Sequence, residues 1–166
     1  LDGKAATNLA LIGKQAGTNF TNSLLVGHAT TGTLNAATSN TGVGIAALDA
    51  LSSGDNNTAL GFQANTTVAS TNNNTAIGMY ANRLSTGTGN TAVGAISLST
   101  ANTGNYNTVI GESSGSNITS GDGNVMIGKV DAASATGDRQ LKIAGNDGST
   151  TTTWISGDSS GNVSVP

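Results

Sequence analysis

The chain has 166 residues, of which 24 are glycine, 9% are charged and 3% are aromatic, and its net charge is −3. Globular domains usually carry about a quarter charged residues, and this acidic chain offers no basic patch for nucleic acid or an anionic membrane. No apolar run approaches the roughly 20 residues of a membrane-spanning helix, and the absence of cysteine excludes disulfides and thiolate metal sites. We therefore expect neither nucleic-acid binding nor membrane insertion.

A short motif, Asn-Thr-Ala-(Ile/Leu/Val)-Gly, recurs along the chain. The clearest copies occupy residues 57–61, 74–78, 90–94 and 107–111, weaker copies occupy 40–44 and 124–128, and copies with one extra residue occupy 8–13 and 22–27. Successive motif glycines are separated by 14 residues at the first step and by 16 or 17 afterwards. A fixed period this short predicts a solenoid with one coil per repeat. We expect an all-β parallel β-roll of about eight coils over residues 1–130.

Within one coil, β-branched residues bounded by Gly, Asn and Ser predict two short strands joined by a bend near the motif glycine. A branched aliphatic residue precedes every motif glycine, namely Ile12, Val26, Val43, Leu60, Ile77, Val93, Ile110 and Ile127. The pattern allows this column either to fill the coil interior or to form a contact between chains. The third residue after the glycine is almost always small, and the seventh is usually apolar, with Leu84 one place early and Ala101 in a later copy.

The asparagine of each copy forms a further column, Asn8, Asn22, Asn40, Asn57, Asn74, Asn90, Asn107 and Asn124. Stacked asparagine amides can bond along a solenoid and satisfy the backbone groups of turns. A row of sugar or ion ligands is the functional alternative, and we favour the structural interpretation. The structural repeat is then carried by Asn57, Gly61, Asn74, Gly78, Asn90, Gly94, Asn107 and Gly111.

The period stops after Gly128, and residues 131–166 predict a second, smaller unit. Residues 140–144 alternate as a strand, the turn Gly-Asn-Asp-Gly follows, residues 150–156 form a second strand, and a further turn leads into residues 163–165. We expect a β-meander that closes the end of the stack. Trp154 is the only tryptophan, and we expect it to pack in this cap or between chains rather than to bind sugar.

Catalytic chemistry has no motif in this chain, so we predict no enzyme activity, no cofactor and no metal site. His28 is the only histidine, and a metal site on a symmetry axis is its less favoured interpretation. If a receptor-binding surface exists, the aromatic residues that vary between coils, Phe62, Tyr80 and Tyr106, are the candidates for it. Five threonines, Thr41, Thr58, Thr75, Thr91 and Thr108, form a column that on a β-solenoid can bind ice.

The repeats resemble a known family. The copy N-S-L-L-V-G at residues 22–27 is similar to the head repeats of YadA-like trimeric autotransporter adhesins, which form a left-handed parallel β-roll that trimerises. The 17-residue copies look more like bacteriophage tail-fibre relatives of that head, including those of marine and cyanobacterial phages. The C-terminal residues 152–166 also resemble tail-fibre segments that often precede a self-cleaving trimerisation chaperone.

This resemblance implies a homotrimeric segment of a phage tail fibre, located in the virion. Such a segment would be a rigid shaft or head that presents loops to a glycan or protein on the bacterial surface. The head of a bacterial surface adhesin and an ice-binding solenoid remain the alternatives.

Overall fold

The computed structural model of this chain describes residues 13–27 and 32–166. These residues form an all-β fold of twelve strands without a helix. The strands are β1 (Gly13–Gly17), β2 (Phe20–Val26), β3 (Ala37–Thr38), β4 (Thr41–Val43), β5 (Thr58–Leu60), β6 (Thr75–Ile77), β7 (Thr91–Val93), β8 (Thr108–Ile110), β9 (Val125–Ile127), β10 (Leu141–Asn146), β11 (Thr151–Gly157) and β12 (Val163–Ser164). The predicted β-solenoid is confirmed.

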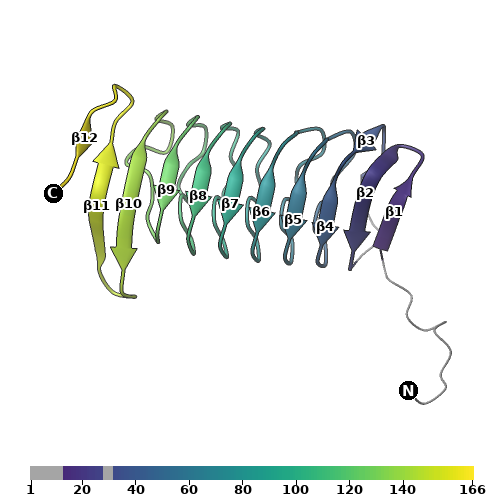
Figure 1. The fold of residues 1–166 in the computed structure, drawn as a ribbon, viewed down its shortest axis with the longest axis horizontal. Coiled ribbons are helices and arrows are strands. Elements are labelled where there is room, and N and C mark those ends of the chain that lie inside the picture. The colour runs from purple at the N-terminus through teal and green to yellow at the C-terminus, as the bar shows by residue number, and fades with distance from the viewer. Residues whose placement is uncertain (1–12, 28–31) are drawn as a thin grey trace, which may run out of the picture.

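Strand β2 and strands β4 to β10 stack in parallel and build a rod (Figure 1). Each strand pairs with the next in the same motif register, so that Leu60 lies opposite Ile77 and Ala59 opposite Ala76. The seven parallel steps from β2 to β10 span about 34 Å at the usual strand spacing. The chain thus has about seven coils. The expected first coil begins outside the described residues, and its Gly13 starts β1, which pairs antiparallel with β2.

Strands β4 to β9 have three residues each, and from β4 onward each coil contains one strand where the sequence predicted two. The second half of the coil is a run of turns in which alternate residues are left-handed, such as Gln63 at φ 52 and Asn65 at φ 50. Their N–H groups bond in opposite directions along the rod, to Ile45 O at 2.9 Å and to Ala81 O at 3.1 Å. Alternating left-handed residues break the extended backbone of a strand, so the chain turns back tightly in this half. Its backbone groups still form hydrogen bonds between coils.

The middle residue of each strand points into the coil. This column is buried throughout and consists of Leu25, Gly42, Ala59, Ala76, Ala92, Val109 and Met126. The small residues three places after the motif glycines, Ala47, Ala64, Ala81, Ser97 and Ser114, are buried as well. Larger side chains complete the core, chiefly Phe20, Leu48, Leu51, Val68, Leu98 and Ile118. Leu84 and Ala101, which the sequence placed in the apolar column after the motif glycines, are exposed, and Ser85 and Asn102 are buried beside them.

The motif glycines stand where the chain leaves the strand. Gly61 has φ 137, and a Cβ atom there would lie 2.5 Å from the carbonyl oxygen of Gly78 in the next coil. Gly44 and Gly111 meet the following glycine at the same distance. A side chain would therefore suffer both an unfavourable backbone conformation and a clash between coils.

Two strands, β11 and β12, continue the sheet beyond the stack in antiparallel pairing. Strand β10 pairs in parallel with β9 and antiparallel with β11, and β11 pairs with β12. These strands lie close to the residues expected for the meander. The sheet continues from the last coil into the hairpin, and the domain boundary predicted between residues 130 and 131 falls in the loop between β9 and β10.

Candidate functional surfaces

A column of fully buried asparagines, which we call the inner ladder, runs along the stack: Asn40, Asn57, Asn74, Asn90, Asn107 and Asn124. The Oδ1 atom of each accepts a hydrogen bond from the backbone N–H of the next coil, at 2.9 Å from Asn107 N to Asn90 Oδ1. The Nδ2 atom of Asn90 donates to the carbonyl oxygen of Gly104 at 2.8 Å. Buried polar groups need such partners, so these contacts favour the structural interpretation over a row of ligands.

Different side chains take the place of asparagine at the two ends of the inner ladder. Asn40 N donates to Ser23 Oγ at 2.8 Å, and Gln140 N donates to Asn124 Oδ1 at 2.8 Å. The Nε2 atom of Gln140 also donates to two loop carbonyls at 2.8 Å each. Asn22, which the sequence placed in this column, is exposed and left-handed at φ 52. The extra residue in its copy shifts the register by one.

A second column, the outer ladder, was missed by the sequence reasoning. Its members are Asp55, Asn72, Thr88, Asn105, Asp122 and Asp138, which lie two residues before Asn57, Asn74, Asn90, Asn107, Asn124 and Gln140. Here the hydrogen bond runs the other way, since Thr38 N donates to Asp55 Oδ1 at 2.8 Å and Asn105 N donates to Asp122 Oδ1 at 2.6 Å. The signal in the sequence is a short polar residue at a fixed offset from the next coil's asparagine or Gln140. The two ladders tie each coil to both of its neighbours.

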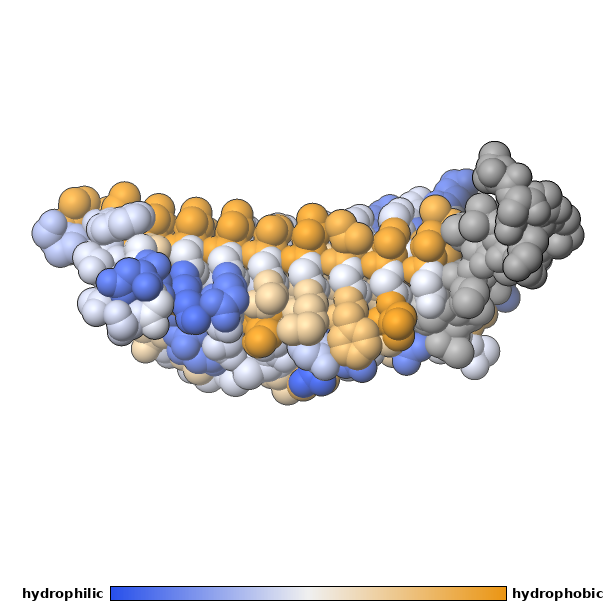
Figure 2. Space-filling model, turned by 90° about the horizontal axis from the view of Figure 1, so that it is seen from below, coloured by the Kyte–Doolittle hydropathy of each residue, from blue (hydrophilic) through white to orange (hydrophobic). Residues whose placement is uncertain are grey.

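The branched aliphatic column faces outward and does not fill the coil interior, and its contact between chains stays a prediction. Leu60 is 48% exposed, Ile77 38% and Ile110 41%, while the residue directly before each of them, Ala59, Ala76 and Val109, is buried. We call this column the aliphatic ladder: Val26, Val43, Leu60, Ile77, Val93, Ile110 and Ile127, continued by Ile143 in register with Ile127. Figure 2 shows it as an unbroken row of apolar side chains along the molecule.

Another column of outward side chains, which we call the flank, lies on the opposite side of the motif glycines from the aliphatic ladder. It consists of Ile45, Phe62, Met79, Ala95, Glu112 and Lys129. Ile45 is 63% exposed, and the flank is apolar toward the N-terminal end and charged toward the C-terminal end (Figure 2). Lys129 Nζ lies 2.9 Å from Glu112 Oε2. The hydrogen bond and the charge of Lys129 hold the pKa of Glu112 below its usual value.

The three aromatic candidates for receptor contact do not form one site. Phe62 and Tyr80 meet edge to face with ring centroids 5.3 Å apart, and the Arg83 guanidinium lies 4.9 Å from the Tyr80 ring centroid. Tyr106 lies on another side of the coil, directly before the inner ladder, where its ring contacts Gly89. It is 70% exposed.

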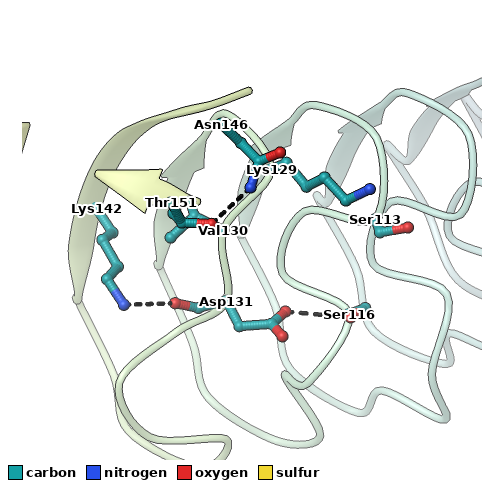
Figure 3. A pocket seen from close by; sticks show the side chains of 8 residues that line it. All are labelled: Ser113, Ser116, Lys129, Val130, Asp131, Lys142, Asn146 and Thr151. Carbon is teal, nitrogen blue, oxygen red and sulfur yellow. Dashed lines mark hydrogen bonds between the residues drawn. The ribbon is translucent and has the colours of Figure 1, made fainter. Parts of the chain in front are cut away.

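A polar hollow of about 410 Å³ lies between the last coils and the β10–β11 hairpin (Figure 3). Lys142 Nζ donates to the carbonyl oxygen of Asp131 at 3.2 Å, and Ser116 Oγ donates to Asp131 Oδ1 at 3.1 Å. Lys129, which also lines the hollow, is the residue paired with Glu112. The charged groups around this hollow are thus engaged by the chain itself.

Trp154 lies on the hairpin and is 56% exposed. Its ring covers Gly145, where a Cβ atom would come within 2.4 Å of Trp154 Cζ2. Asn146, Asp147 and Thr150 line a shallow hollow beside the ring. Within one chain the indole therefore packs on a glycine and leaves much of its surface to solvent.

The threonine column faces outward beside the aliphatic ladder and ends at Leu24 and Val125. His28 lies outside the described residues. Within the described residues, no group of three or more His, Cys, Asp or Glu side chains could hold a metal ion. No helix in that part of the chain is long and apolar enough to cross a membrane.

Comparison with protein-family models, with curated proteins and with solved structures found no match for this chain.

Proposed function

We propose that this chain is a non-enzymatic segment of a phage tail fibre, in which three copies form a rigid shaft or head that presents loops to a receptor on the bacterial surface. The observation that carries the proposal is the aliphatic ladder, an uninterrupted apolar row on the outside of a stiff rod. Monomeric proteins rarely leave such a contiguous apolar patch in water. We expect the partner to be another copy of this chain, because its aliphatic ladder repeats with the same spacing at every coil.

The shape of the apolar surface favours a ring over a pair. The aliphatic ladder and the apolar part of the flank, Ile45, Phe62 and Met79, lie on two sides of the corner made by the motif glycines. A wedge that is apolar on both sides of its edge can contact two neighbours at once, as subunits do around a symmetry axis. Together with the resemblance to trimeric adhesin heads and phage fibres, this supports three copies.

The charges on the flank favour parallel copies. In an antiparallel pair the charged end of one flank would lie against the apolar end of the other, so that Lys129 and Glu112 would face Ile45 and Phe62. Burying charges against apolar groups is costly. In a parallel arrangement each coil meets the same coil of its neighbours, and the flank lies beside the outward threonine column. Three parallel copies would turn weak sites into avid binding.

Cysteine cross-linking tests the arrangement, because the natural chain contains no cysteine. Val43→Cys places a thiol in the aliphatic ladder near one end, and a parallel assembly predicts rapid disulfide formation between copies. A mixture of Val43→Cys and Ile127→Cys chains should then give few mixed disulfides, because these residues lie five coil steps apart, about 24 Å. Thr103→Cys, on an exposed loop, is the control. Mixed disulfides in excess would refute the parallel arrangement.

The assignment to a fibre has a separate test in the parent gene. A cleavable chaperone domain encoded downstream supports the tail fibre. A membrane-anchor barrel in its place would support the adhesin head and overturn the phage assignment.

Ice binding is a second candidate, favoured by one observation: the threonine column faces outward on a regular rod. It is only one residue wide. Thermal hysteresis of the purified protein at millimolar concentration would support this candidate, and its absence would exclude it.

A further inference from the structure

We propose that Tyr106 is the centre of a glycan-binding site on the loop edge of the rod, with Asp122 and Arg139 as the polar groups that bind sugar hydroxyls. The inference rests on the proposed function, in which loops meet a bacterial receptor, and it names the chemical class of that receptor.

Tyr106 occupies a backbone position that does not favour tyrosine. It is left-handed at φ 58, as are the residues at the same place in the other coils, Ser39, Asn56, Asn73, Gly89, Gly123 and Arg139. Glycine and asparagine tolerate this conformation, whereas a bulky residue there costs on the order of 1 kcal/mol. With 70% of Tyr106 exposed, burial within the chain offsets little of that cost. A tyrosine that is strained and largely exposed points to a binding role for its ring.

Glycine stands beside Tyr106 in both neighbouring coils and keeps the surface around the ring open. The Cδ1 and Cε1 atoms of Tyr106 lie 2.7 and 3.0 Å from the place of a Cβ atom on Gly89. On the other side, a Cβ atom on Gly123 would meet Arg139 Cγ at 3.6 Å and no other atom within 4 Å. The ring thus rests on Gly89. In the coil on the other side only the Arg139 side chain comes near Gly123, and we call the surface at Gly123 the shelf.

Two charged side chains lie close to this shelf. Asp122 precedes Gly123, and its Oδ1 atom accepts from Asn105 N at 2.6 Å and from Asn105 Nδ2 at 3.2 Å. The described residues give Asp122 Oδ2 no hydrogen bond. Arg139 is exposed, two coil steps or about 10 Å from Tyr106 along the rod, and its Nε atom donates to Ser159 O at 3.5 Å.

This combination fits a sugar better than a protein. An aromatic ring offers an apolar surface to the C–H face of a sugar, and a carboxylate and a guanidinium can bind neighbouring hydroxyls with paired hydrogen bonds. A protein interface usually needs apolar anchors that fit buried pockets. The apolar surface of this chain lies instead on the aliphatic ladder and the flank, and the loop edge around Tyr106 is polar.

The test measures binding of the purified protein to an array. The array carries neutral and acidic oligosaccharides, and purified outer-membrane proteins on separate spots. Wild-type protein should bind at least one class of oligosaccharide. Tyr106→Asn should lose at least about tenfold in affinity, as expected for one lost contact of about 1.4 kcal/mol. It should keep its melting temperature, because asparagine occupies the same place at Asn56 and Asn73. Gly123→Asn, which fills the shelf, should also lose binding, while Ser39→Asn, four coils away in the same column, should not.

Three results would overturn the glycan site: binding to the protein spots alone, no binding at all, or Tyr106→Asn binding as tightly as wild type. The molar mass of each variant is measured in parallel. A trimer that binds no glycan refutes this inference and leaves the proposed assembly intact. A monomer that binds glycan through Tyr106 refutes the assembly and leaves this inference intact.

Discussion

Replacing Asn90 by alanine tests the inner ladder near its centre. The substitution removes the acceptor of the Asn107 N–H, at 2.9 Å, and the donor to the Gly104 carbonyl, at 2.8 Å. Both groups belong to buried residues. An orphaned buried polar group costs about 1–3 kcal/mol. The two orphans share one site and will not add fully, so we expect Asn90→Ala to lower the free energy of unfolding by about 3 kcal/mol.

Urea unfolding followed by circular dichroism measures this loss. The protein concentration must be held constant, because assembly makes apparent stability depend on it. Asn35→Ala is the control, since Asn35 is exposed and exposed substitutions usually change stability by less than about 0.5 kcal/mol. If Asn90→Ala costs no more than the control, the ladder contributes nothing and our account of the stack is wrong.

Asn90→Asp separates the role of the side chain as hydrogen-bond acceptor from its role as donor. The new carboxyl keeps an acceptor for Asn107 N–H but loses the donor to Gly104 O, and burial should raise its pKa in the folded state. A raised folded-state pKa means that the penalty is largest at neutral pH and shrinks as the pH falls through that pKa. The variant should therefore recover stability on mild acidification, when the protonated carboxyl can donate to Gly104 O.

Three further outcomes follow from the geometry. Gly78→Ala should destabilise the stack by more than about 2 kcal/mol, because a Cβ atom there would lie 2.6 Å from the backbone of the next coil; an unchanged melting temperature would count against close coil stacking. Gly145→Ala should push Trp154 off the hairpin and shift the emission of this only tryptophan to longer wavelength, and an unshifted spectrum would place the ring elsewhere. Turn hydrogen bonds, chiefly from Thr150 N and from Asn162 Nδ2, hold the pKa values of Asp147 and Asp158 below the ordinary value. The stability they contribute is present above about pH 4 and is lost as the pH falls through the folded-state values. The double Asp→Asn variant should lose less stability than wild type on acidification, and equal losses would contradict the assignment.

The period of the motif was enough to predict the parallel stack, because only one coil per repeat brings Thr58, Thr75 and Thr91 into register. The period was not enough to predict which side chains face the coil interior. Thr58 and Leu60 share one side of a strand and Ala59 takes the other, and hydrophobicity alone would bury the leucine. The structure buries the alanine because the coil is narrow and other columns already fill it.

The left-handed half of each coil could not be predicted from residue type. Leu48, Ile96 and Leu98 adopt positive φ, although such residues rarely do so. The backbone bonds between coils impose this conformation, for instance from Ile96 N to Met79 O at 2.8 Å. The outer ladder could not be predicted for a related reason. Asp, Asn and Thr in a loop look like solvated turns until the coils are stacked.

Tyr106 was a candidate from its chemistry alone, as an aromatic residue that varies between coils. The strain at its φ and the open glycines beside it became visible only when the coils were stacked. Phe62 was a candidate on the same grounds, yet it lies on the flank that we propose faces another copy. Sequence variation therefore found both residues but could not separate a receptor contact from a contact between chains.

The molar mass of the wild-type chain in solution, measured by light scattering beside Ile77→Lys and Ser70→Lys, tests the central claim most directly. Ile77 lies in the aliphatic ladder and Ser70 on an exposed loop of the same coil. We predict three times the 16.2 kDa of one chain for wild type and for Ser70→Lys, and dissociation for Ile77→Lys, because a lysine cannot be buried among three apolar rows. A stable wild-type monomer, or an Ile77→Lys variant that assembles as wild type does, would contradict self-association through the aliphatic ladder.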